Sequence, residues 1–87
     1  MEDVYVLTID WLDDHSTVRQ SVDAFKHEEK ANEALQMFDI EVADWLKKKD
    51  YHSWVREGDG NTFIEYGKPG NYYDSHAVAK ITKCTVK

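Results

Sequence analysis

The feature that most constrains this chain is a long amphipathic segment near its middle. Between residues 27 and 49, apolar side chains recur at spacings of three and four, the period of a helix that buries one face. Two glutamates open the segment and three lysines close it, an order that the helix dipole favours. The pattern predicts a helix about 34 Å long. Its buried stripe comprises Ala31, Ala34, Leu35, Phe38, Val42, Trp45 and Leu46.

Two strand-like segments precede this helix. Residues 4–11 read VYVLTIDW and are largely apolar on both alternating faces, so the sequence does not decide which face meets the helix. Residues 13–16 form a polar cluster typical of a turn, and residues 17–25 alternate again. Two strands joined by a short polar stretch predict a β-hairpin.

The second half of the chain predicts shorter strands. Strand-like segments cover residues 51–56, 62–66 and 77–86, and residues 72–76 either continue the middle one or form a short edge segment. The loops contain Gly and Asn, and the longer one also contains the only proline. The predicted order is β-β-α-β-β-β, an α+β fold with a four- or five-stranded antiparallel sheet and one long helix on one face.

Length and composition narrow the class of protein. A chain of 87 residues leaves no room for a second core, so residues 1–87 are expected to form one domain. The single Cys84 excludes an internal disulfide framework and fits a reducing compartment. The N-terminus lacks the basic start of a secretory signal, and no stretch approaches 18 apolar residues. We expect a cytoplasmic protein that makes no membrane contact.

The usual signatures of cofactor and substrate chemistry are missing from the sequence. Neither phosphate-binding glycine motif occurs, and none of the four histidines forms a close metal-binding pair. Cys84 could act as a nucleophile only if the fold placed His52 or His76 beside it. We therefore expect no catalytic residue, no cofactor and no metal, and a metal-binding or small enzyme domain remains a second alternative. Its ligands would come from Asp10, Asp13, Asp14 and His15, or from Asp74 and His76.

Charge is distributed unevenly along the chain. Residues 1–45 contain 12 acidic and three basic residues, a balance of −9, whereas residues 46–87 contain five acidic and eight basic residues, a balance of +3. An acidic surface repels phosphate backbones and attracts basic grooves, so direct nucleic-acid binding is not expected. The acids either form a solvated helix face or bind a basic groove in another protein. Single-strand binding through the aromatic residues of the later strands is a further alternative.

These patterns select candidate partner-binding residues. Tyr72 and Tyr73 lie in a predicted loop, where exposed tyrosines can anchor a protein contact. Ile40 lies opposite the apolar stripe of the helix and could contact a partner or a second copy. The acidic candidates are Asp13, Asp14, Glu29, Glu33 and Asp44.

The layout also resembles a known group of proteins. Residues 4–8 (VYVLT) precede an acidic turn, residues 22–25 (VDAF) run into residues 28–31 (EEKA), and residues 81–86 (ITKCTV) form a late strand. In the order of its elements, most of the chain resembles short accessory proteins encoded by bacteriophages and prophages. The resemblance carries no shared catalytic residues. It implies a bacterial cytoplasmic setting and a role against, or alongside, a host protein.

The expected function is therefore that of a non-catalytic acidic phage or prophage accessory protein that binds and modulates a host protein. Inhibition of a nucleic-acid-binding factor or a defence nuclease, by mimicry of an acidic surface, would fit this expectation. The first alternative is a self-associating structural module, a homodimer that pairs through the open sheet face or through Ile40.

Overall fold

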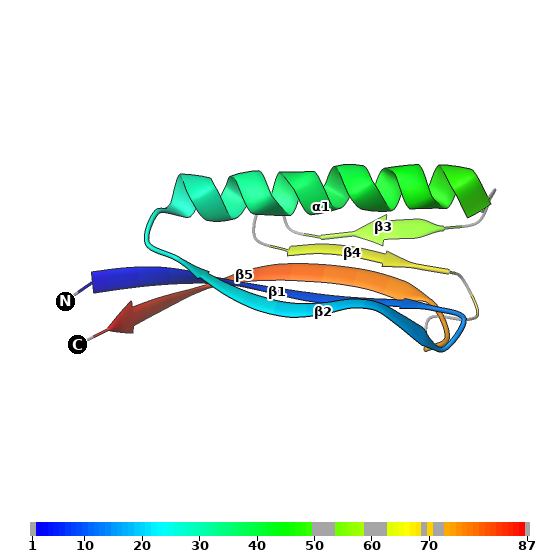
Figure 1. Ribbon diagram of the computed structural model, residues 1–87, viewed down its shortest axis with the longest axis horizontal. Coiled ribbons are helices and arrows are strands. Elements are labelled where there is room, and N and C mark those ends of the chain that lie inside the picture. Colours follow the sequence, from blue (N-terminus) through cyan, green and yellow to red (C-terminus); the bar gives the residue numbers. More distant parts are fainter. Residues whose placement is uncertain (1, 50–53, 59–62, 69, 71–72, 87) are drawn as a thin grey trace.

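The computed structural model describes residues 2–49, 54–58, 63–68, 70 and 73–86. The five strands of the described residues join one antiparallel sheet in the order β2-β1-β5-β4-β3, and the helix lies along one face of it (Figure 1). This arrangement confirms the predicted α+β class and element order. The elements are β1 (Glu2–Asp13), β2 (Ser16–Phe25), α1 (Glu28–Lys49), β3 (Val55–Glu57), β4 (Phe63–Gly67) and β5 (His76–Val86).

The first and last strands form the centre of the sheet. They pair over eleven positions, from Glu2 opposite Val86 to Leu12 opposite His76. The two ends of the chain therefore lie side by side (Figure 1). The strand pair also extends beyond its neighbours, because among the described residues β2 ends opposite Tyr5 and β4 begins opposite Lys80. The molecule is accordingly elongated, with extents of 45 × 20 × 19 Å.

The core lies between the sheet and α1. The face of β1 that carries Leu7, Ile9 and Trp11 packs against the helix, which settles a question that the sequence leaves open. Two fully buried alanines on β5, Ala77 and Ala79, present small side chains on the same face, so the helix can approach the sheet closely. The remaining core residues are Ala31, Leu35, Phe38, Val42, Ile64, Tyr66 and Ile81.

A tight turn joins β1 to β2. Asp14 and His15, the two residues between the strands, both have positive φ, 48° and 70°. Two successive positive φ values are characteristic of a type I′ turn, whose twist matches that of an antiparallel pair. The register shifts between Trp11 and Leu12, which leaves Val18 as the extra residue of a bulge. The predicted hairpin is confirmed.

The later strands differ from their predicted bounds. In the part of the chain that the structure describes, β3 covers Val55–Glu57 rather than residues 51–56, of which 51–53 lie outside the described residues. Residues 73–75 form a turn, although a strand was predicted there. The reason is a contact distant in sequence: the His15 backbone N–H donates to the Asp74 carbonyl at 2.8 Å, and the Asp14 N–H donates to Ser75 Oγ at 2.9 Å. The β1–β2 turn therefore holds this segment in place.

Candidate interaction surfaces

The side of α1 that points away from the sheet carries four of the predicted residues, which we call the helix face: Glu29, Glu33, Ile40 and Asp44. All four are exposed, and the Ile40 side chain is 57% accessible. The neighbouring Met37 is also exposed, so a small apolar surface lies among the acids. The helix period brings these side chains to one side because α1 continues without interruption from Glu28–Lys49.

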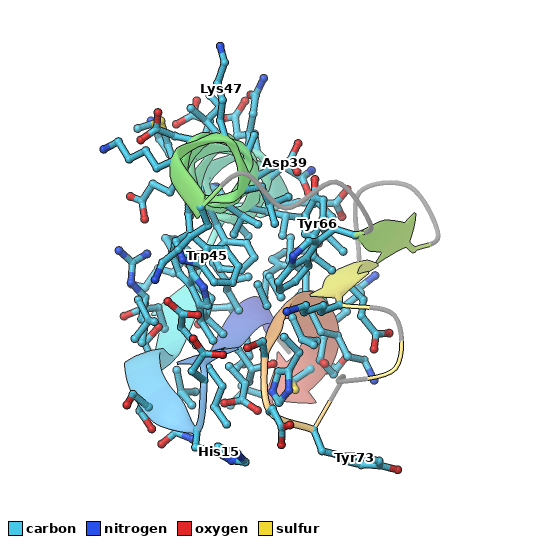
Figure 2. All side chains as sticks on the ribbon, turned by 90° about the vertical axis from the view of Figure 1, so that its right-hand side faces the viewer. His15, Asp39, Trp45, Lys47, Tyr66 and Tyr73 are labelled. Carbon is cyan, nitrogen blue, oxygen red and sulfur yellow. The ribbon has the colours of Figure 1, made fainter. Side chains whose placement is uncertain are left out.

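Lysines partly neutralise the helix face. Lys30 Nζ lies 3.6 Å from a Glu33 carboxylate oxygen, and Lys48 Nζ lies 3.0 Å from one of Asp44. Pairs as exposed as these contribute little to stability, and a stronger cationic partner can replace them. Glu29 makes no ion pair with any other residue that the structure describes. Lys47 also points away from the sheet (Figure 2), so the three acids of the helix face stand beside three lysines, and Glu29 is the acid that none of the described ion pairs neutralises.

The predicted binding residue Asp13 has an internal role. Its carboxylate is 15% accessible, accepts a hydrogen bond from Trp45 Nε1 at 3.3 Å and pairs with Lys49 Nζ at 3.1 Å. These contacts tie the end of β1 to the last turn of α1. The Asp13 carboxylate is therefore occupied within the molecule, whereas the neighbouring Asp14 is exposed.

A second group of polar residues lies at the turn end of the sheet, and we call it the tip: Asp14, His15, Tyr73 and Asp74. His15 Nε2 lies 3.2 Å from Asp74 Oδ1, and the Tyr73 side chain is 87% accessible. Figure 2 shows His15 and Tyr73 pointing away from the molecule at the end opposite the helix. Tyr72, the other predicted anchor, lies outside the described residues.

The predicted binding residues thus fall on two surfaces rather than one. The helix face and the tip lie on opposite sides of the sheet layer (Figure 2). One compact partner groove cannot cover both at once. Of the two, the helix face holds more of the predicted residues, together with the exposed apolar side chains between them.

The sheet face opposite α1 carries a polar cluster that sequence reasoning missed. His76 Nε2 lies 3.0 Å from Asp10 Oδ2, and Gln20 Nε2 donates to Asp10 Oδ1 at 3.2 Å. The hydrogen bond from His76, aided by the one from Gln20, lowers the pKa of the Asp10 carboxyl below its ordinary value of 3.8 despite an opposing effect of burial. Three strands supply these residues, so only the strand order and register could have revealed the cluster.

Among the residues that the structure describes, neither the predicted metal ligands nor Cys84 and His76 form the arrangement that their chemistry would need. In the described part of the chain, no group of three or more His, Cys, Asp or Glu side chains could hold a metal ion. Cys84 lies opposite Val4, near the chain ends, whereas His76 lies eight residues away along the same strand. At about 3.3 Å per residue their separation is about 26 Å, far beyond hydrogen-bond reach. His52, the other possible base, lies outside the described residues.

A groove runs between α1 and β2. Leu7, Ile9 and Phe38 form its floor, and its volume is about 550 Å³. Arg19 from β2 and Glu41 from α1 pair at 2.7 Å, joining the two walls. A smaller hollow of about 340 Å³ lies on the opposite sheet face beside Val22. The remaining residues of the first groove are Ser21, Asp23, Ala34 and Met37.

Comparison with known proteins found no matching family model, no matching curated protein and no matching solved structure. No described helix is both long enough and apolar enough to cross a membrane. Function must therefore be argued from the surfaces themselves.

Proposed function

We propose that this protein is a non-catalytic interaction protein whose helix face binds a basic groove of another protein. The observation that carries the proposal is the exposed set Glu29, Glu33 and Asp44 around the exposed Ile40, on one uninterrupted helix. Acidic side chains steer a basic partner toward contact, and apolar side chains among them add affinity once water is excluded.

A groove that binds nucleic acid has the matching chemistry. Such grooves are lined with Lys and Arg, which neutralise regularly spaced phosphates. The carboxylates of Glu29, Glu33 and Asp44, all on one side of α1, would occupy such a groove in place of the phosphates. The net charge of −6 favours the encounter at low salt and opposes contact with nucleic acid itself.

The proposed biological setting is that of a bacteriophage or prophage accessory protein in a bacterial cytoplasm, where it would modulate a host factor. The resemblance in element order supports this setting. A nuclease or another nucleic-acid-binding enzyme is the class of host protein whose groove the helix face fits. Neither a substrate nor a cofactor is needed for this role.

The test is capture from a bacterial lysate at low salt with the immobilised protein. A Glu33→Lys/Asp44→Lys variant should retain less than about a tenth of the bound protein, because both acids that flank Ile40 are reversed. A Glu2→Lys/Asp3→Lys variant changes the net charge by the same amount as the first variant. Its substitutions lie at the start of β1, away from the helix face, so it should capture as much protein as the wild type. Added double-stranded DNA should release the captured protein. Equal capture by both variants would refute the helix face as the contact.

A further inference from the structure

The outer edge of β2 is an unpaired strand edge. In the order β2-β1-β5-β4-β3, β2 is terminal, and along Ser16–Phe25 it pairs on one side only among the described residues. Every second residue of such a strand directs its backbone N–H and C=O outward, ready to pair with another strand. Natural edge strands are usually protected by charged side chains, above all Lys, by Pro or by a bulge. Between residues 19 and 25 β2 has no Lys, no Pro and no bulge, since its bulge lies earlier, at Val18, and its two charged residues, Arg19 and Asp23, have opposite signs.

Apolar side chains accompany this edge. Val22, in the middle of the strand, is 71% accessible, and Val18 is also exposed. Both are β-branched residues that suit a strand buried by a neighbour. Along most of the other described strands, valines and isoleucines are covered at least in part. A further strand beside β2 would reduce the exposure of Val22.

We infer that β2 pairs with β2 of a second copy of this chain, antiparallel, about a two-fold axis at Ser21. Charge complementarity selects the second copy as the occupant. In this register Arg19 lies opposite Asp23 of the second copy, and Asp23 lies opposite Arg19 of the second copy. Two ion pairs form across the seam, and Val22 packs beside Gln20 of the second copy. The five-stranded sheets join into one sheet of ten strands with both helices on the same face.

The sequence of β2 favours this register over its neighbours. Moving the axis by one residue shifts the pairing by two, which places Arg19 opposite Ser21 or Phe25 and removes both ion pairs. An axis at Arg19 or at Asp23 would bring like charges together, which destabilises directly opposed strand positions. Only the axis at Ser21 matches each charge with its opposite.

The local contacts leave both charged groups able to form these pairs. Arg19 already binds Glu41, but its guanidinium has five N–H donors and its side chain is 41% accessible. Asp23 is exposed and makes no ion pair with another described residue. The groove between α1 and β2 is lined by both residues, so the seam would border it.

Sedimentation equilibrium over a wide concentration range tests the pairing, with the full chain as the sample. The wild type should show a reversible monomer–dimer equilibrium. Asp23→Arg should raise the dimer dissociation constant at least about tenfold, because two like-charged pairs replace two attractive ones. Asp44→Arg makes the same charge change on the helix face and should leave dimerisation unchanged. A thermal unfolding curve for each variant confirms that it folds.

Cross-linking fixes the register independently. In a Cys84→Ser background, Ser21→Cys should form an intermolecular disulfide under mild oxidation, because residue 21 lies opposite its own copy on the axis. Ala24→Cys, exposed on the same strand, lies opposite Val18 of the second copy and should not. A chain that stays monomeric at every concentration overturns the inference. So does a dimer that tolerates Asp23→Arg, or an edge that accepts a peptide of another protein while the chain remains monomeric.

Discussion

Asp10 shows how a single side chain can depend on the completed sheet. Its two partners, Gln20 and His76, come from the strands on either side of β1. In the unfolded chain the three residues are far apart, so the hydrogen bonds that lower the Asp10 pKa exist only in the folded state.

This linkage predicts a pH dependence of stability. Because the folded-state pKa of Asp10 is depressed, its contribution is present above the unfolded value of 3.8 and is lost as the pH falls through the folded pKa. An Asp10→Asn variant should therefore lose less stability than the wild type between about pH 5 and pH 3. Urea unfolding at a series of pH values measures the difference. Asp3→Asn, on the same strand, is the control. A variant whose pH profile matches that of the wild type would contradict the linkage.

The tight turn carries a second residue-scale consequence, because His15 has a φ of 70°. Glycine adopts positive φ at no steric cost, whereas alanine does not. Both His15→Gly and His15→Ala remove the side-chain contact with Asp74, so their comparison isolates the backbone. We expect the glycine variant to be more stable by about 1 kcal/mol.

Thr17 provides the matched control for this comparison. It lies in β2 and is not among the positive-φ residues, so Thr17→Ala should be more stable than Thr17→Gly, the usual order. Chemical denaturation of the four variants measures both differences. An alanine preference at position 15 as well as at position 17 would contradict the type I′ turn.

Among the elements, α1 contributes more buried core residues than any described strand. Phe38 is 1% accessible and contacts Trp11 edge-to-face, with ring centroids 5.7 Å apart. Trp45 continues this aromatic cluster at 5.2 Å from Trp11 and 4.9 Å from Trp54. Tyr66 on β4 donates its hydroxyl to Asp39 of the helix, which fixes α1 to the other half of the sheet (Figure 2).

Two adjacent helix positions test this view of the core. Phe38→Ala should lower the free energy of unfolding by about 3–5 kcal/mol, because it opens a cavity between the helix and the sheet. Met37→Ala, one residue away and exposed, should change it by less than about 1 kcal/mol. Denaturant titrations followed by circular dichroism report both values. Similar losses at the two positions would mean that the helix packs through a different face.

Sequence periodicity predicted the elements in which apolar residues recur at a regular spacing. Apolar residues recur every three to four residues in the helix and every two residues in the strands of the first hairpin, and both elements form where expected. The segment around Asp74 and Ser75 was assigned wrongly because its conformation depends on hydrogen bonds to Asp14 and His15, sixty residues earlier. The residues around positions 74 and 75 do not by themselves indicate a contact so distant in sequence.

The same distinction applies to the candidate surfaces. Glu29, Glu33, Ile40 and Asp44 share one exposed face because the helix wheel alone determines it. Asp13 could not be understood from its neighbours in sequence, since Trp45 and Lys49 bind it from the end of α1. The sequence therefore predicts which residues share one face of an element, but not the contacts that a residue such as Asp13 makes with another element.

In the molecule as a whole, the pairing of β1 with β5 joins the first and the last strand at the centre of the sheet. Val4 lies directly opposite Cys84 in this pair. Directly opposed residues of antiparallel strands have Cα separations of about 4.5–5.5 Å, which a disulfide can span.

A Val4→Cys variant should therefore form an intramolecular disulfide with Cys84 under oxidising conditions. Because this bond encloses most of the chain, it should raise the free energy of unfolding by about 2–4 kcal/mol. Non-reducing electrophoresis and denaturation with and without reductant measure the effect. Asp3→Cys, whose side chain points to the other face of the sheet, should not cross-link. A disulfide formed from position 3 instead of position 4 would show that the register of β1 and β5 differs by one residue from the one described here.

The central position of β1 also has a consequence for how the chain reaches its fold during synthesis. Between 64 and 84 residues separate the paired positions of β1 and β5. A nascent chain can form the first hairpin and the helix early, but one edge of β1 stays bare until the last strand emerges from the ribosome. During that interval the half-built sheet exposes an unpaired strand edge, the kind of surface through which incompletely folded chains aggregate or engage chaperones.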